Sequence, residues 1–89
     1  MKHLDITIYG EVQGVSFRYY AKQKADELNL FGFIRNQLDG SVFAEVEGEA
    51  KALDSFVDWI RTGPAHSKVD RIEIGEGMMK NYTAFEIRL

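Results

Sequence analysis

The sequence predicts an α+β domain in which two helices cover one face of an antiparallel sheet. Apolar residues recur at every second position in several segments and at helical spacing in two others. These segments follow the order strand, helix, strand, strand, helix, strand, with a short strand at the end. The chain has 89 residues, of which 45 % are hydrophobic and none is cysteine. This size and composition suit one hydrophobic core without disulfide bonds, so we expect a single domain over residues 1–89.

A change in periodicity predicts the first strand and the first helix. Apolar and polar residues alternate from Leu4 to Val12, which is typical of a half-buried strand. Past Gly14 the apolar residues take helical spacing, and Ser16 stands where a hydroxyl can cap the first free amides of a helix. The apolar stripe of this helix consists of Phe17, Tyr20, Ala21, Ala25 and Leu28.

A hairpin and a second helix are expected next. Two β runs, 31–38 and 41–48, flank Asp39-Gly40, whose tolerance of positive φ suits a tight hairpin turn. Apolar residues at helical spacing over 53–60 predict a helix that Gly63-Pro64 ends. In the second β run, one face carries Val42, Ala44 and Val46, and the other carries Phe43, Glu45 and Glu47.

Two further strands complete the predicted sheet. Val69–Ile74 is predicted as a fourth strand, and Phe85, Ile87 and Leu89 alternate with charged residues in a short last strand. The resulting order is that of the ferredoxin-like split βαβ sandwich, βαββαβ plus a short C-terminal strand. Because this fold carries many functions, the function has to be argued from a site.

Charge and composition exclude several classes of protein. The net charge of −3 has the wrong sign for binding nucleic acid over a broad surface. No apolar run is long enough to cross a membrane or to serve as a signal peptide, so we expect a cytoplasmic protein, and a monomer as the plain case. The lack of cysteine excludes thiolate chemistry. His3 and His66 stand apart in the sequence and we expect the acidic residues to be spread over the surface, so we expect no metal and no cofactor.

The stretch from Gly10 to Arg18 predicts an anion-binding loop. A glycine-containing turn that leads into a helix N-terminus directs several backbone N–H groups and the positive end of the helix dipole to one point. Arg18 in the first turn adds a guanidinium that can bond two oxygens of a phosphate or carboxylate. The alternative is that the glycines only permit the turn and Arg18 pairs with a surface carboxylate.

Known phosphate-handling motifs do not fit this loop. The ATP-binding loop needs Gly-Lys-Ser/Thr, whereas Val15 and Ser16 follow Gly14. The hydrolase elbow Gly-x-Ser-x-Gly fails because Arg18 stands at its second glycine, and Ser16 has no evident base. A cysteine phosphatase would carry its thiol six residues before the arginine, at Val12. The loop therefore has no evident nucleophile.

This anion-binding loop, called the cradle below, has no nucleophile, metal or strong base beside it. It can therefore catalyse only the hydrolysis of a bond whose leaving group departs readily. An acyl phosphate fits, because its carboxylate leaving group departs without protonation. The protein then needs to hold the phosphoryl group and position one water molecule. The amide of Asn36 has both a donor and an acceptor and can orient that water. The alternative for Asn36 is a structural residue that ends the strand before Asp39-Gly40.

The sequence closely resembles the acylphosphatases (acylphosphate phosphohydrolases), small enzymes that hydrolyse acyl phosphates. The first family signature is matched throughout Ile8–Arg18, and the second by Gly32–Asn36 with Gly40, Val42 and Gly48 at the expected intervals. Gly63-Pro64 and Phe85–Ile87 are also similar to the family, so the likeness spans the chain. The main departures are Ile34, where valine is usual, and Asn29, where glycine is common; we expect both to affect packing rather than chemistry.

The resemblance implies a catalytic pair and a phosphate-binding loop. It assigns phosphate binding to Arg18 and the loop amides, and the orientation of water to Asn36, with a substrate phosphate oxygen as base and no covalent intermediate, metal or cofactor. Inorganic phosphate is then product and competitive inhibitor. Two alternatives stay open, an RNA-recognition module and a non-catalytic phosphate sensor with the same loop. The phosphate-binding residues implied are Gln13, Gly14, Val15, Ser16, Phe17 and Arg18.

Overall fold

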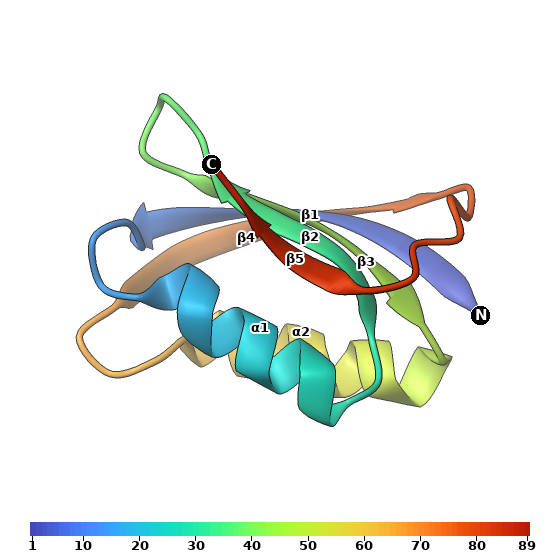
Figure 1. Ribbon diagram of the computed structural model, residues 1–89. Coiled ribbons are helices and arrows are strands. Elements are labelled where there is room, and N and C mark those ends of the chain that lie inside the picture. Colours follow the sequence, from blue (N-terminus) through green and yellow to red (C-terminus); the bar gives the residue numbers. More distant parts are fainter.

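The computed structural model describes all residues, 1–89, as one sheet covered by two helices (Figure 1). The sheet has five strands in the order β4-β1-β3-β2-β5. Both helices lie on the same face of the sheet, as Figure 1 shows. This arrangement confirms the predicted ferredoxin-like α+β fold. The elements are β1 (Lys2–Glu11), α1 (Phe17–Glu27), β2 (Phe31–Asn36), β3 (Val42–Gly48), α2 (Ala50–Thr62), β4 (Lys68–Gly77) and β5 (Phe85–Arg88).

The last strand makes the sheet mixed rather than wholly antiparallel. Strands β1, β2, β3 and β4 pair antiparallel, but β5 pairs parallel with β2, with Gly32 opposite Phe85 and Arg35 opposite Arg88. The cause is the connection 78–84, which carries the chain from the β4 edge of the sheet to the opposite edge. The expectation of an antiparallel sheet is therefore wrong for β5. None of the helices is long and apolar enough to cross a membrane.

The hydrophobic core lies between the helices and one face of the sheet. The central strands bury Ile6, Ile8 and the face of β3 that carries Val42, as their alternation predicted. Helix α1 buries part of its predicted stripe, whereas Tyr20 is 43 % exposed at the edge of the helix and Leu28 is half-buried. Helix α2 ends as expected at Gly63. The helical part of the core consists of Phe17, Ala21, Ala25, Leu53, Phe56 and Ile60.

Two local expectations differ in detail from the structure. Ser16 does occupy the N-cap position of α1, but it has a left-handed backbone conformation and its side chain makes no capping bond. A capping residue has an extended backbone conformation, and in the left-handed one the Ser16 hydroxyl makes no bond to the amides that a cap would satisfy. The hairpin between β2 and β3 is a five-residue loop, 37–41, rather than a tight turn, because the register ends at Asn36 opposite Val42.

The face of the sheet opposite the helices is covered at one end by the connection 78–84. Glu47 is fully buried there and accepts hydrogen bonds from the backbone N–H groups of Lys80 (2.6 Å) and Tyr82 (3.1 Å). Burial alone would raise the pKa of Glu47, but these bonds and one with His3 outweigh it and hold the pKa below its ordinary value. Glu45 is nearly buried as well. The expectation that the acidic residues are spread over the surface is therefore wrong for these two.

Candidate active site

The loop between β1 and α1 has the backbone geometry of an anion cradle. Gly14 and Ser16 both have positive φ, 75° and 61°, while Val15 between them does not. Alternation of left-handed and right-handed residues turns successive N–H groups toward the same side of the chain. Helix α1 begins immediately afterwards at Phe17, so the free amides of its first turn lie in the same region. A glycine at position 14 meets the need for positive φ without strain.

The side chain of Gln13 fastens this loop to the hairpin loop. Its Nε2 donates to the backbone carbonyls of Gln37 at 2.7 Å and of Ser41 at 2.9 Å. The side chain of Gln37 in turn donates to the hydroxyl of Ser41 at 2.9 Å. These bonds tie the cradle to the hairpin loop, which lowers the cost of ordering the loop amides around an anion.

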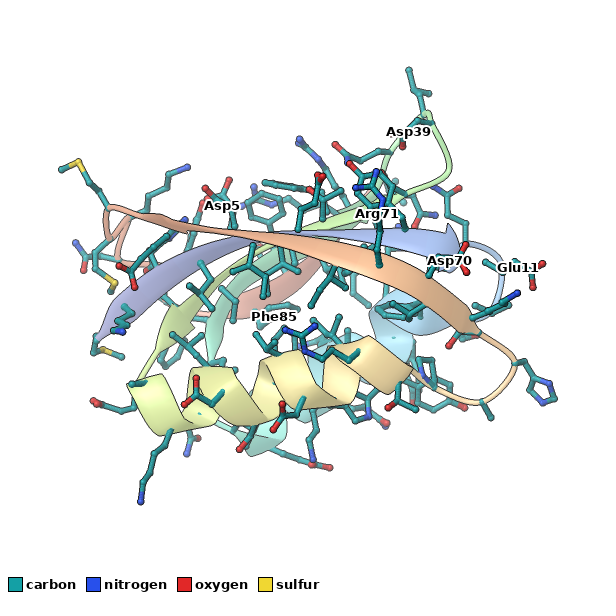
Figure 2. All side chains as sticks on the ribbon, turned by 180° about the vertical axis from the view of Figure 1, so that it is seen from behind. Asp5, Glu11, Asp39, Asp70, Arg71 and Phe85 are labelled. Carbon is teal, nitrogen blue, oxygen red and sulfur yellow. The ribbon has the colours of Figure 1, made fainter.

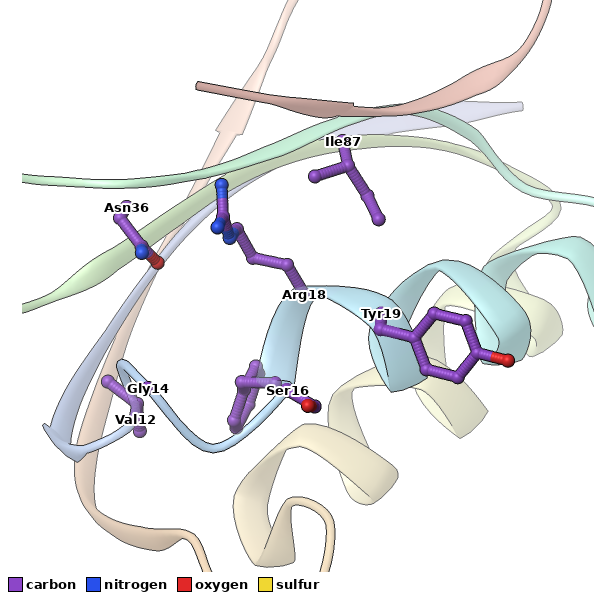
Figure 3. Close-up of a pocket in the computed structure, with 8 residues that line it drawn as sticks. Val12, Gly14, Ser16, Arg18, Tyr19, Asn36 and Ile87 are labelled. Atoms are coloured by element: carbon purple, nitrogen blue, oxygen red, sulfur yellow. The ribbon is translucent and has the colours of Figure 1, made fainter.

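Arg18 and Asn36 reach the same cavity from two different elements. The cavity has a volume of about 390 Å³. Figure 3 shows the Arg18 guanidinium from α1 and the Asn36 amide from the end of β2 lying across from one another within it. Arg18 Nη1 donates to the backbone carbonyl of Arg88 at 2.9 Å. The lining residues are Val12, Gly14, Ser16, Phe17, Arg18, Tyr19, Asn36 and Ile87.

The hydrogen bonds around this cavity leave the Asn36 amide free for a ligand. The side chains that make hydrogen bonds around the cavity are those of Gln13, Gln37 and Arg18, and the side chain of Asn36 makes none. Because one Nη1 bond occupies only part of the guanidinium, Arg18 keeps further N–H groups to donate. No lining residue is a histidine, cysteine or carboxylate. The site therefore combines donors for an anion with a neutral amide, and lacks a protein group that could serve as a strong base.

The structure brings together most of the residues that the sequence singled out. Gly14, Ser16, Phe17, Arg18 and Asn36 line one cavity. Two members of the predicted phosphate loop do not line it. The side chain of Gln13 points to the hairpin loop, and Val15 lines a neighbouring groove and packs against the core. Phe17 is 2 % exposed, so its ring belongs to the core and its contribution to a ligand would come from the backbone.

Sequence reasoning missed the contribution of the last strand. Ile87 lines the cavity, and the carbonyl of Arg88 holds Arg18. The signal that could have found them is the alternation over residues 85–89, which predicts the strand but not its partner. His66 is exposed and lies outside this cavity, in the neighbouring groove with Val15.

Comparison with known proteins decides the family. A family model described as Acylphosphatase matches residues 4–87. The chain belongs to the acylphosphatase family. It is 42 % identical over 85 residues to an acylphosphatase of Nocardioides sp., which is 96 % of this chain and 86 % of the relative. It is 52 % identical over 66 residues to an acylphosphatase of Mannheimia succiniciproducens, 74 % of this chain and 73 % of the relative.

The fold agrees with a solved member of the family along its whole length. The crystal structure of acylphosphatase from Bacillus subtilis superposes with a TM-score of 0.98 at 37 % sequence identity and covers 100 % of both chains. The two signatures that carried the resemblance in the sequence form the cradle and the end of β2 in the structure. The family and the fold inferred from the sequence are thus confirmed.

Proposed function

We propose that this protein hydrolyses the carboxyl–phosphate bond of small-molecule acyl phosphates to a carboxylate and inorganic phosphate. The observation that carries the proposal is the meeting of Arg18 and Asn36 in one cavity beside the loop of positive-φ residues. The loop and Arg18 supply donors for phosphoryl oxygens, and Asn36 supplies a neutral group for water. Family membership supports the same reaction.

In this mechanism the protein binds and orients but makes no covalent bond. The backbone amides from Gln13 to Arg18 and the Arg18 guanidinium hold the phosphoryl oxygens and stabilise charge in the transition state. The Asn36 carbonyl oxygen accepts from the attacking water and fixes its approach to phosphorus. The water oxygen bonds to phosphorus while the bond to the acyl oxygen breaks. The water proton passes to a phosphoryl oxygen, because no basic side chain lines the cavity.

Two further properties belong to the proposal. Inorganic phosphate presents the same oxygens as the substrate, so it binds the cradle as product and competes with acyl phosphates. The cavity is completed by α1, β2 and β5 of one chain, so a monomer is sufficient for activity.

The test is the initial rate of benzoyl phosphate hydrolysis in the presence of a chelator, with inorganic phosphate titrated as competitor. Arg18→Ala should abolish turnover and phosphate binding. Arg18→Lys should restore little of the turnover, because an ammonium group cannot donate two parallel hydrogen bonds as the planar guanidinium does. Arg35→Ala is a matched control. It removes an exposed arginine that lies over the rings of Phe33 and Phe43, away from the cavity, and should leave the rate unchanged.

The remaining alternatives give different results in the same experiment. Phosphate binding with no turnover would make the protein a phosphate sensor and Asn36 a structural residue. Activity of Arg18→Ala near the wild-type level would refute the assignment of Arg18. Retention of single-stranded RNA at moderate salt would favour the RNA-recognition reading. Against that reading, β3 offers only one aromatic ring, Phe43, which is half-buried beneath Arg35.

A further inference from the structure

The cavity that holds Arg18 and Asn36 has an apolar side that the proposed hydrolysis does not use. Tyr19 and Ile87 line it together with those two residues. Both are large apolar side chains that the fold leaves exposed. In the mechanism above neither of them touches the phosphoryl group or the attacking water. Both are therefore free to contact the acyl half of the substrate.

The direction of β5 shows that Ile87 is an inward-facing residue. Phe85 leaves this strand into the core between the sheet and the helices, as Figure 2 shows, and is 3 % exposed. Side chains two residues apart in a strand leave the same face, so Ile87 also points to the helix side of the sheet. It is nevertheless 40 % exposed, because the cavity lies beside it. The apolar layer between sheet and helices is thus left partly uncovered at this point.

Tyr19 presents its hydrocarbon part rather than its hydroxyl to the cavity. The hydroxyl accepts a hydrogen bond of 3.1 Å from Nε2 of Gln23, one turn further along α1. Figure 3 shows this hydroxyl pointing away from Arg18. The ring also meets that of Tyr20 edge to face, with the centroids 5.2 Å apart, which restricts its rotation. Tyr19 therefore offers a held apolar surface.

The geometry of phosphoryl transfer directs the acyl group toward these two residues. The attacking and leaving oxygens lie roughly in line on opposite sides of phosphorus. Asn36 holds the water in the proposed mechanism, so the acyl oxygen leaves from the side of the phosphoryl group opposite Asn36. In Figure 3, Asn36 lies on one side of the Arg18 guanidinium, and Tyr19 and Ile87 lie on the other. The departing acyl group therefore faces the apolar side of the cavity.

The charges around this side of the cavity do not favour a charged acyl group. Arg18 is the only charged residue that lines the cavity, and the phosphoryl group occupies it. Lys22, one turn further along α1, does not line the cavity. Its Nζ donates to Oδ2 of Asp26 and to the carbonyl of Phe85, both at 3.0 Å. A carboxylate on the acyl group would lose water and gain no partner here.

We propose that Tyr19 and Ile87 form an acyl-binding wall, which selects acyl phosphates whose acyl group is uncharged and either aromatic or branched aliphatic. This inference rests on the proposed hydrolysis and names its substrate class. A ring or a branched chain covers both side chains and removes apolar surface from water, whereas an acetyl group is too small to cover both. The wall does not touch the reacting atoms, so the two residues determine specificity.

The neighbouring groove is the other place where an acyl group could lie. It shares only Gly14 and Ser16 with the cavity and is also lined by Trp59, Pro64 and His66. An acyl group in this groove would have to cross the backbone of the loop whose amides hold the phosphoryl oxygens. The groove is therefore the alternative that the experiment has to separate from the wall.

The test compares kcat/KM for benzoyl, isovaleryl, acetyl and para-carboxybenzoyl phosphates. Isovalerate and acetate are leaving groups of similar basicity, so a difference between their phosphates reports contacts with the acyl group rather than reactivity. The wild type should prefer isovaleryl and benzoyl phosphate to acetyl phosphate by at least about 10-fold, as for added apolar groups in an apolar site. It should also prefer benzoyl to para-carboxybenzoyl phosphate.

Variants of the wall should change this preference without changing the cradle. Tyr19→Ala should lower the preference for benzoyl over acetyl phosphate about 5-fold, and Ile87→Thr, which keeps a β-branched residue in the strand, about 3-fold. Tyr19→Phe should keep the preference, because only the ring faces the substrate. The inhibition constant for inorganic phosphate should stay within about 2-fold of wild type in all three. His66→Ala is the control for the groove and should leave the preference unchanged.

Four results would overturn the acyl-binding wall. They are equal kcat/KM of the wild type for isovaleryl and acetyl phosphate, an unchanged preference in Tyr19→Ala, loss of the preference in Tyr19→Phe, or a fall in His66→Ala as large as in Tyr19→Ala. Hydrolysis of all the substrates without preference would leave the proposed function standing and refute the wall alone. Hydrolysis of none of them would refute the proposed function, and the wall with it.

Discussion

Arg18 Nη1 donates a 2.9 Å hydrogen bond to the backbone carbonyl of Arg88, so the last strand holds the arginine of the phosphate cradle in place. A guanidinium on a four-bond stem has many rotamers, and the bond to a carbonyl in the sheet selects one that faces the cavity. A backbone oxygen serves this purpose whatever the side chain at position 88. Strand β5 is therefore part of the site as well as the edge of the sheet.

Removal of Arg88 and Leu89 should weaken the site without unfolding the chain. Without the carbonyl, Arg18 loses one hydrogen bond of a charged group, and kcat/KM for benzoyl phosphate should fall about 10-fold. The new terminus ends one residue, about 3.3 Å, too early to replace the lost oxygen. Leu89→Ala, at a fully exposed position, keeps the neutral Arg88 carbonyl and should leave kcat/KM unchanged. Equal effects of the truncation and of Leu89→Ala would contradict the anchoring role of Arg88.

Asn36→Ala should separate turnover from binding. The variant loses the group that orients water, so kcat should fall about 10²–10³-fold, as for loss of one transition-state donor. The cradle and Arg18 remain, so the inhibition constant for phosphate should stay within about 3-fold of wild type. Steady-state kinetics with phosphate as inhibitor measure both quantities. A matching loss of phosphate affinity would mean that Asn36 holds the phosphate itself.

Local sequence patterns predicted most of the fold, because periodicity reports which face of each element is buried. The alternation of β1 and β3 correctly placed Ile6, Ile8 and Val42 in the core. The pattern carries no information on partners, so the parallel pairing of β5 with β2 was not foreseen. The other face of β3, which carries Phe43, Glu45 and Glu47, has a pattern that does not say what covers it. It is covered by the 78–84 connection, whose backbone donors allow Glu47 to be buried.

The candidate site was predictable where its chemistry lies in one short stretch. Gly14 and Arg18 stand together in the cradle motif, and Asn36 belongs to a second motif. The groups that depend on distant pairing were not predictable. The Arg88 carbonyl reaches Arg18 only through the β2–β5 register. His3 meets Glu45 and Glu47 only through the β1–β3 register, which pairs residues more than 40 positions apart in the sequence.

Asn29 affects backbone conformation rather than packing, contrary to the expectation from the sequence. Its φ is 56°, and α1 ends in a Schellman motif with Leu30 N bonded to Ala25 O and Asn29 N bonded to Asp26 O. Asn29→Gly should stabilise the fold by about 0.5 kcal/mol, because glycine adopts this conformation without strain. Asn29→Ala should destabilise it by about 1 kcal/mol. Urea unfolding measures both; a ranking other than Gly, Asn, Ala would contradict the account.

The hairpin loop should make stability depend on pH in the acid range. Hydrogen bonds from the Ser41 hydroxyl (2.5 Å) and the Ser41 backbone N–H (2.9 Å) lower the pKa of Asp39 below its ordinary value. A carboxyl whose pKa is lower in the folded state binds fewer protons there than in the unfolded chain. Its contribution to stability is therefore present above the unfolded pKa, about 4, and is lost as pH falls through the folded pKa.

Comparison of wild type with Asp39→Asn isolates this contribution from that of the other acids. The difference in unfolding free energy between the two should be constant from pH 7 to about 5 and should shrink toward pH 2. Asp39→Asn made in a Ser41→Ala background, which lacks the hydroxyl donor to Asp39, should show a smaller change with pH. A difference for Asp39→Asn that does not vary with pH would contradict the prediction.

The same loop is linked to the cradle, because Ser41 bonds to Asp39 and its carbonyl accepts a hydrogen bond from Gln13. Protonation of Asp39 should therefore loosen the support of the cradle. Over the same pH range, the phosphate affinity of the wild type should fall more than that of Asp39→Asn.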